Sequence, residues 1–134
     1  MCLRYKIRRI LTSLKWKTQR FKRGYADVDV WDFNSWFLAT IPKMLTQLKE
    51  QLHGYPVNME FKDWEKYLKE MINHFEVAST IDDVDDYYPE DYVYLSEAEK
   101  DLLREKSMEH IKHCKEELHK GLQMLEVRFF DLWD

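Results

Sequence analysis

Turn-forming residues are scarce in this chain, and their scarcity constrains the fold more than any other feature of the sequence. Only three glycines and three prolines occur in 134 residues. Sandwiches and barrels need frequent turns between short strands, so the sequence predicts an all-α protein. An apolar content of 45%, with 15% aromatic residues, is too high for a disordered chain. We therefore expect residues 1–134 to form a single helical domain.

The strongest helical signal begins at Asp27 or Asp29, either of which suits a helix N-cap. Apolar residues surround the first half of this helix on nearly every side, so we expect it to be the central and most buried element. We expect it to reach about His53, with Gly54 at its C-cap. Pro42 lies inside the helix and predicts a kink, because proline lacks the backbone donor that the helix needs there.

Two further helices are indicated by apolar residues at three- and four-residue spacing. The first begins at Asn58 or Glu60 and should form an antiparallel hairpin with the central helix. The second begins at a capping box, Ser96 to Glu99, and runs to the C-terminus. The sequence thus predicts a small helical bundle with a kinked central helix, a helical hairpin and a long C-terminal helix. Because the last helix is longer than its neighbours, a second copy should cover part of its apolar stripe, which predicts a homo-oligomer.

The first 24 residues form a basic arm. Residues 1–26 contain nine lysines or arginines and no acidic residue, whereas the whole chain has a net charge of −4. Apolar residues recur at helical spacing from Leu3 to Leu14, which is typical of a basic amphipathic helix. Such a helix either docks its stripe on the core, which we favour, or contacts a membrane surface or nucleic acid. The candidate nucleic-acid contacts are Arg4, Lys6, Arg8, Arg9, Lys15 and Lys17.

Residues 78–95 have the opposite charge and are rich in tyrosine. With several aspartates and no lysine or arginine, this segment is predicted to be an extended loop. An acidic loop that carries tyrosines can imitate nucleic-acid phosphates or bind a basic partner. The alternatives are a solvated loop or one that pairs with the basic arm of the same chain.

Catalytic signatures are missing from the sequence. It contains no glycine-rich phosphate loop, no serine or cysteine nucleophile motif and no zinc-protease pair. His110, His113 and Cys114 fall within one helical turn, but a structural zinc site takes four ligands, normally from more than one element. We therefore predict a protein that is not an enzyme, with no catalytic residues, no cofactor and no metal site.

The junction between the basic arm and the central helix is the best candidate for ligand binding. A helix N-terminus offers backbone N–H groups to an anion, two arginines would reinforce it, and an aromatic ring could stack on a base. The alternative is structural: Asp27 caps the helix, Arg23 pairs with an acid and Trp31 belongs to the core. The candidate ligand-binding residues are Arg20, Arg23, Tyr25, Asp27 and Trp31.

The compartment is indicated by two features. No apolar run approaches the ~18 residues of a spanning helix, so no transmembrane segment is expected. The two cysteines, Cys2 and Cys114, make no disulfide framework, which favours a reducing compartment.

Three motifs are distinctive: Arg-Gly-Tyr-Ala-Asp-Val-Asp-Val-Trp at 23–31, His-Gly-Tyr-Pro at 53–56, and Gly-Leu-x-x-Leu-x-x-x-Phe-x-x-Leu-Trp-Asp at 121–134. Together they resemble a family of small phage- and prophage-encoded helical proteins. The resemblance implies a viral origin and a location in the host cytoplasm. The family has no established activity, so the resemblance assigns no catalytic or binding residues.

These observations give one leading hypothesis and two alternatives. The first is a non-enzymatic phage accessory binding protein that counteracts host defence by sequestering an anionic nucleotide signal. The second is a structural or nucleic-acid-associated phage protein that uses the basic arm. The third is an inhibitor that binds a host protein through the acidic segment 78–95.

Overall fold

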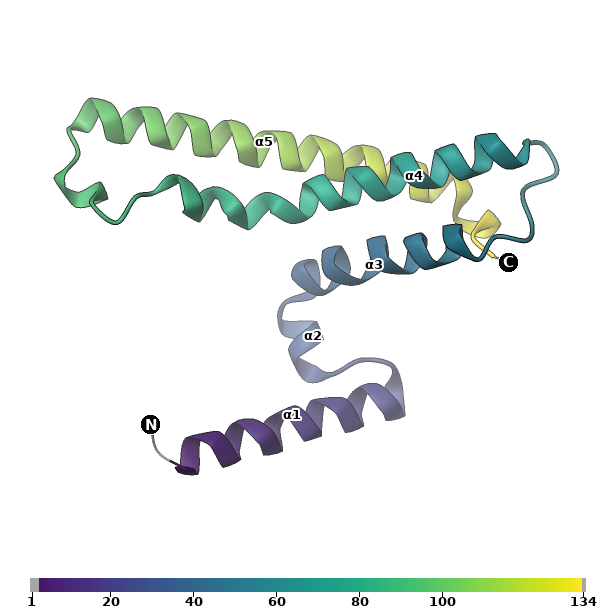
Figure 1. The fold of residues 1–134 in the computed structure, drawn as a ribbon, viewed down its shortest axis with the longest axis horizontal. Helices are drawn as coiled ribbons and strands as arrows, with labels where there is room; N and C mark the ends of the chain where they lie inside the picture. Colours follow the sequence, from purple (N-terminus) through teal and green to yellow (C-terminus); the bar gives the residue numbers. More distant parts are fainter. Residues whose placement is uncertain (1–2, 134) are drawn as a thin grey trace. The chain divides into compact units, whose positions relative to one another are not determined.

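The structure, a computed structural model, describes residues 3–133, and the side chains of 6–84 and 88–133. Every regular element in this described part is a helix, so the predicted all-α class is confirmed (Figure 1). The chain divides into two compact units, Met1–Phe37 and Leu38–Asp134, where the sequence predicted one domain. We describe each unit by itself.

The first unit contains α1 (Leu3–Arg23), α2 (Asp27–Trp31) and the start of α3 (Phe33–Glu50). Helix α1 ends at Gly24, whose φ of 82° lies in the left-handed region that glycine adopts without steric cost. The Gly24 N–H donates to the Arg20 carbonyl at 2.9 Å, which satisfies one of the last carbonyls of the helix.

The predicted central helix differs from the observed one in three ways. It is interrupted at Asp32, whose φ of −128° and ψ of 56° are not helical, so that α2 and α3 are separate helices. Pro42 lies inside α3 as predicted, and the helix ends at Glu50 rather than at about His53. Gly54 lies beyond that end, in the connection to α4, and does not cap the helix. The N-cap of α2 is Ala26, one residue before the predicted Asp27.

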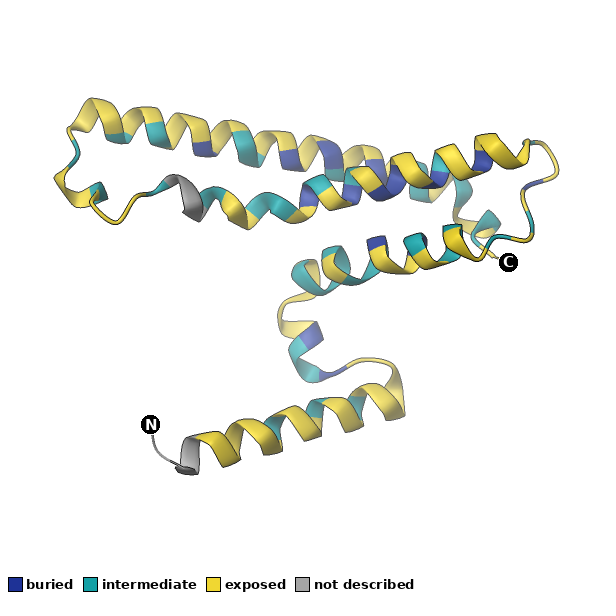
Figure 2. Ribbon diagram, in the orientation of Figure 1, coloured by how far each residue is buried: buried dark blue, intermediate teal, exposed yellow. Residues whose placement is uncertain are grey.

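The core of the second unit is formed by α4 (Phe61–Ala78) and α5 (Glu97–Arg128), which pack side by side in antiparallel directions (Figure 1). The helical hairpin is therefore α4 with α5, rather than the central helix with α4 as predicted. Figure 2 shows that the dark blue, buried positions concentrate where these two helices face each other. The buried residues of the pair are Trp64, Leu68, Met71, Ile72, Phe75, Ala78, Ser107, Cys114, Glu117 and Gly121.

The expectation that the central helix is the most buried element is wrong. Val30, Trp31 and Phe33 are exposed, and only Pro42 and Leu45 of α3 are buried. The physical reason is geometric, since a helix that is apolar all round can bury only the side that meets a neighbour. Helix α4 has its large apolar residues on one face, and α5 covers that face along its length.

Gly121 allows α4 and α5 to approach closely. A Cβ added at Gly121 would lie 3.0 to 3.2 Å from three atoms of the Phe75 ring, which is closer than ordinary van der Waals contact. Farther along the pair, the Tyr67 hydroxyl donates to the Met124 carbonyl at 2.8 Å. These contacts fix the register of the hairpin.

The acidic segment is helical rather than an extended loop. Residues Ser79–Tyr87 form a 3₁₀ helix, η1, and Tyr92–Tyr94 form a second, η2. Helix η1 continues directly from the end of α4, and it packs against both α4 and α5. The side chains of residues 85–87 lie outside the described part. The prediction of a loop over 78–95 thus holds only for the short connections around η2.

The capping box predicted at the start of the long helix is confirmed. The Ser96 N–H donates to Glu99 Oε2 at 2.9 Å, and the Glu99 N–H donates to Ser96 Oγ at 3.4 Å. Helix α5 then runs for 32 residues, and a short 3₁₀ helix, η3 (Phe129–Asp131), follows it. The Trp133 ring lies beside Gly54, so the end of the chain packs on the α3–α4 connection.

Candidate functional site

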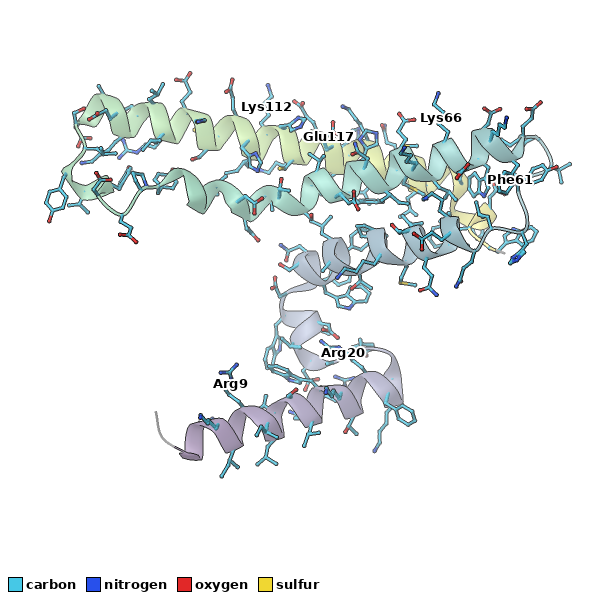
Figure 3. All side chains as sticks on the ribbon, in the orientation of Figure 1. Arg9, Arg20, Phe61, Lys66, Lys112 and Glu117 are labelled. Carbon is cyan, nitrogen blue, oxygen red and sulfur yellow. The ribbon has the colours of Figure 1, made fainter. Side chains whose placement is uncertain are left out.

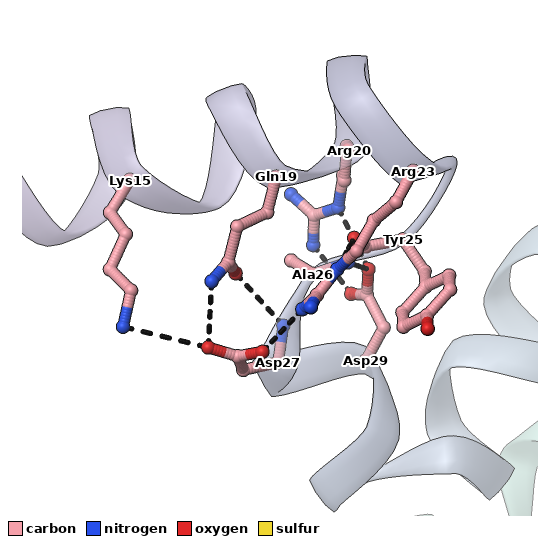
Figure 4. A network of polar contacts seen from close by, with 8 residues as sticks. All are labelled: Lys15, Gln19, Arg20, Arg23, Tyr25, Ala26, Asp27 and Asp29. Atoms are coloured by element: carbon pink, nitrogen blue, oxygen red, sulfur yellow. Dashed lines mark hydrogen bonds and ion pairs between the residues drawn. The ribbon is translucent and has the colours of Figure 1, made fainter.

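The junction of α1 and α2 is held by an ion pair in which both partners point toward each other (Figures 3 and 4). Arg20 on α1 donates to both carboxylate oxygens of Asp29 on α2, from Nε at 3.0 Å and from Nη2 at 2.6 Å. Asp29 Oδ2 also accepts the Ala26 N–H at 2.7 Å. Asp29 is buried, and these donors lower its pKa, Arg20 contributing most. This bidentate geometry is strongly directional.

Asp27 forms a second set of contacts at the same junction (Figure 4). It pairs with Arg23 and accepts a hydrogen bond from Gln19 Nε2 at 2.7 Å. Lys15 Nζ lies 3.5 Å from the same carboxylate. The pKa of Asp27 is lowered to about 2, chiefly by the hydrogen bond from Arg23 and then by that from Gln19. The alternative that Arg23 pairs with an acid is therefore the observed arrangement.

The donors that an anion would need at this junction are already used. The Ala26 N–H donates to Asp29, and the Asp27 N–H donates to Gln19 Oε1 at 3.0 Å. Arg20 and Arg23 are both paired with carboxylates of the same chain. A phosphate that bound through these groups would have to displace Asp27 or Asp29. Helix α2 is also only five residues long, so its dipole is small.

The two candidate stacking residues have different surroundings. The Arg23 guanidinium lies over the Tyr25 ring, 4.6 Å from its centroid, so one face of this ring is covered. The Trp31 side chain is exposed and does not belong to a core. A shallow hollow of about 260 Å³ lies beside Tyr25 and has apolar walls, so it suits an apolar group better than a phosphate. Its lining residues are Tyr25, Asp29, Val30, Phe33 and Trp36.

Helix α1 docks on its own unit with its polar face. The half-buried side chains among its described residues are Thr12, Trp16 and Gln19, which recur at helical spacing. Its apolar stripe is exposed on the other side, so the first unit does not bury the stripe, and the docking on the core that we favoured from the sequence stays a prediction. We use the term apolar stripe of α1 for Ile7, Ile10, Leu11, Leu14 and Phe21, all of which are exposed.

The basic residues of the arm are also on the surface. Five of the six candidate nucleic-acid contacts have described side chains, and all five are exposed: Lys6, Arg8, Arg9, Lys15 and Lys17. The side chain of the sixth, Arg4, lies outside the described part. Of these five, Lys15 makes the contact with Asp27 noted above. The candidate arm residues therefore share one helix and one sign of charge, but they surround the helix rather than forming one patch.

His110 and Cys114 lie close together but cannot act as a nucleophile and its base. His110 Nε2 is 2.7 Å from the Thr80 carbonyl, and a carbonyl oxygen only accepts, so this nitrogen carries the proton. It therefore cannot remove a proton from the Cys114 thiol 3.4 Å away. Cys114 is also fully buried. No group of three side chains suited to a metal ion occurs in the described part.

Sequence reasoning missed a buried carboxylate at the centre of the second unit. Glu117 on α5 accepts from Lys120 Nζ at 2.6 Å, and its other oxygen lies 2.5 Å from His74 Nδ1 on α4 (Figure 3). These partners lower the pKa of Glu117 to about 2, Lys120 contributing most. The sequence signal for its burial was its position three residues after Cys114, because residues three apart lie on the same face of a helix. Because both of its oxygens are occupied, Glu117 joins the two helices rather than offering a base.

No helix in the described residues is both long enough and apolar enough to cross a membrane. Comparisons of the chain with protein-family models, with curated proteins and with solved structures find no match.

Proposed function

We propose that this protein is a non-enzymatic phage accessory protein that binds a polyanionic partner through the basic arm, residues 1–24. One observation carries the proposal: the arm is a helix with exposed lysines and arginines and no acid of its own. Its ion pairs with the acids that follow it, Asp27 and Asp29, come from Lys15, Arg20 and Arg23. The phage origin is supported by the sequence motifs at 23–31 and 53–56. Nucleic acid is the polyanion that the sequence hypothesis named.

The way α1 is attached supports a binding role. Its hydrogen bonds and ion pairs to α2 come from Lys15 and from the last turns of the helix, at Gln19, Arg20 and Arg23. Most of the helix length before that point is exposed. A rigid, exposed helix with one sign of charge attracts a polyanion from a distance and contacts it without first being ordered.

Sequestration of an anionic nucleotide stays a prediction, and the geometry gives it less support. Both arginines that it requires are paired with Asp27 and Asp29, and the adjacent hollow has apolar walls. Its test is thermal stabilisation of the protein by nucleotides, which Arg23→Ala should abolish. A role against host defence, or inhibition of a host protein by the acidic segment 78–95, is equally a prediction.

Polyanion binding is tested with the full chain and a duplex DNA of about 20 base pairs as the probe, by fluorescence anisotropy at several salt concentrations. Counterion release predicts that the logarithm of the binding constant falls linearly with that of the salt concentration. Neutralising three exposed side chains of α1, in the variant Lys6→Gln/Arg8→Gln/Lys17→Gln, should lower that slope by up to about 2.7.

A matched control removes three exposed lysines from α4, in the variant Lys62→Gln/Lys66→Gln/Lys69→Gln. It changes the net charge by the same amount and should leave the slope unchanged. Equal losses in the two variants would show that only overall charge matters, and would contradict a binding role for the arm. Absence of salt-dependent binding to any polyanion would contradict the proposal as a whole.

A further inference from the structure

We propose that α1 is an interfacial helix that lies on an anionic lipid bilayer, with its apolar stripe toward the acyl chains and its basic side chains at the phosphates. This inference rests on the proposed function, because it names the polyanion that the basic arm binds. Three arguments lead to it: the orientation of the helix, the position of its charges, and the poorer match of other partners to this surface.

The orientation of α1 leaves the apolar stripe outward. At 100° per residue, Thr12, Trp16 and Gln19 fall in one sector of the helix, and the stripe is centred roughly opposite to it. Those three residues are the half-buried ones, whereas Leu11 is 61% exposed and Phe21 is 91% exposed. Helix α1 is therefore anchored through its polar face, which presents the apolar face to an external partner.

The charges of α1 border the stripe on both sides. At the same angular spacing, Lys6 and Lys17 lie along one edge, and Arg8, Lys15 and Lys22 lie along the other. Lysine and arginine can keep their aliphatic stems along an apolar surface while their charged ends reach outward. A helix with this cross-section places its apolar residues below the headgroups and its cations at the level of the phosphates.

Other partners would use only part of this surface. A nucleic-acid backbone can pair with the lysines and arginines, but it offers no apolar surface to Leu14 or Phe21. A second copy that packs stripe against stripe would bring two basic helices together, and such like-charge contacts are unfavourable. An anionic bilayer is complementary to the stripe and to its charged edges together.

The test is flotation of the full chain with vesicles of phosphatidylcholine alone, or of phosphatidylcholine with about 30 mol% phosphatidylglycerol. We expect binding to the anionic vesicles that is at least about tenfold stronger than to the neutral ones, and that weakens as salt is added. The variant Leu11→Asn/Leu14→Asn should weaken binding by about tenfold or more, because it removes apolar surface that the bilayer would bury.

The matched control is Leu102→Asn/Leu122→Asn, which makes the same change at two exposed leucines of α5. We expect it to bind like the unmodified chain. Circular dichroism should show the same helix content in both variants, because all four leucines are exposed.

Several outcomes would overturn the inference. Failure to float with anionic vesicles, equal binding to both vesicle types, or full binding by Leu11→Asn/Leu14→Asn would each do so. Salt-dependent DNA binding without flotation would overturn the membrane inference and leave the proposed function standing, with nucleic acid as the partner. Loss of both activities would overturn both. A dimer that Leu11→Asn/Leu14→Asn separates, in a chain that does not float, would assign the stripe to a second copy instead.

Discussion

Helices α1 and α4 carry the same kind of sequence pattern and use it in opposite ways. Each has apolar residues at three- and four-residue spacing with lysines between them. On α4 that stripe is the core of the second unit, and Leu68 is fully buried. On α1 the stripe is exposed and the polar face makes the internal contacts. Periodicity therefore identifies which residues share a face, but not what covers that face.

The largest expected effect is a difference in stability between two variants, one that shortens a leucine of the α4 stripe and one that shortens a leucine of the apolar stripe of α1. Leu68→Ala should lower the free energy of unfolding by about 2–5 kcal/mol, because it leaves a cavity in a packed core. Leu11→Ala should change it by no more than about 0.5 kcal/mol, because this side chain is exposed in the folded chain. Urea denaturation followed by circular dichroism measures both. Similar losses in the two variants would show that the stripe of α1 is buried in the free protein.

Acid should weaken the buried ion pair that Glu117 forms in the second unit. The pKa of Glu117 is lowered to about 2 in the folded state, so its carboxylate stabilises the fold above its ordinary pKa and loses that effect as pH falls toward 2. Glu117→Gln should therefore be less stable than the unmodified chain at pH 7. The difference should shrink to below about one third of that value near pH 2. Urea denaturation at both pH values tests this, and a constant difference would contradict it.

The polar junction of the first unit can be loosened by Asp29→Asn. The amide cannot accept both hydrogen bonds from Arg20, and the partner of the Ala26 N–H is weakened. We expect the Ala26 amide to exchange with solvent about tenfold faster. Asp32→Asn is the control, because the exposed side chain of this residue accepts from Ser35 and an amide oxygen can replace the carboxylate there. Faster exchange in the control as well would show that charge at α2, rather than the Arg20 pair, holds the junction.

The smallest effect concerns the glycine that ends α1. Gly24→Ala should destabilise by about 1 kcal/mol, because its φ is positive and the added methyl group meets nothing that could compensate. Gly54→Ala should be nearly neutral, because an added Cβ there meets Trp133 at an ordinary contact distance of 3.7 Å. Thermal unfolding of both variants measures this contrast. A neutral Gly24→Ala would indicate that α1 does not need this turn to stay in place.

Features that depend on neighbouring residues were predictable from the sequence. The capping box at Ser96, the left-handed turn at Gly24 and the apolar face of α4 all follow from local backbone chemistry or helical spacing. The break at Asp32 was not predictable in this way, since apolar residues continue on both sides of it. The choice of α5 as the partner of α4 depends on contacts such as Gly121 with Phe75, which no local pattern specifies.

The sequence grouped Arg20, Arg23 and Asp27 at one junction as candidate ligand-binding residues, which stays a prediction, and it did not foresee in detail how they pair with acids of the same chain. Sequence spacing places Arg23 four residues before Asp27, and in the structure these two residues pair. The pairing of Arg20 with Asp29 spans a turn between two helices, so it depends on the angle that Gly24 sets. The buried Glu117 was missed because a carboxylate is normally assigned to the surface when its partners are unknown.

The attachment of α1 by the last turns of the helix has an evolutionary consequence. Substitutions at Lys6, Arg8 and Leu11 remove exposed side chains that take no part in the junction contacts, so they should leave folding almost unaffected. Under the proposed function, selection can therefore change the affinity of this segment while the same scaffold is retained. In that case partner choice and folding stability are encoded by separate residues, and each can drift without constraining the other.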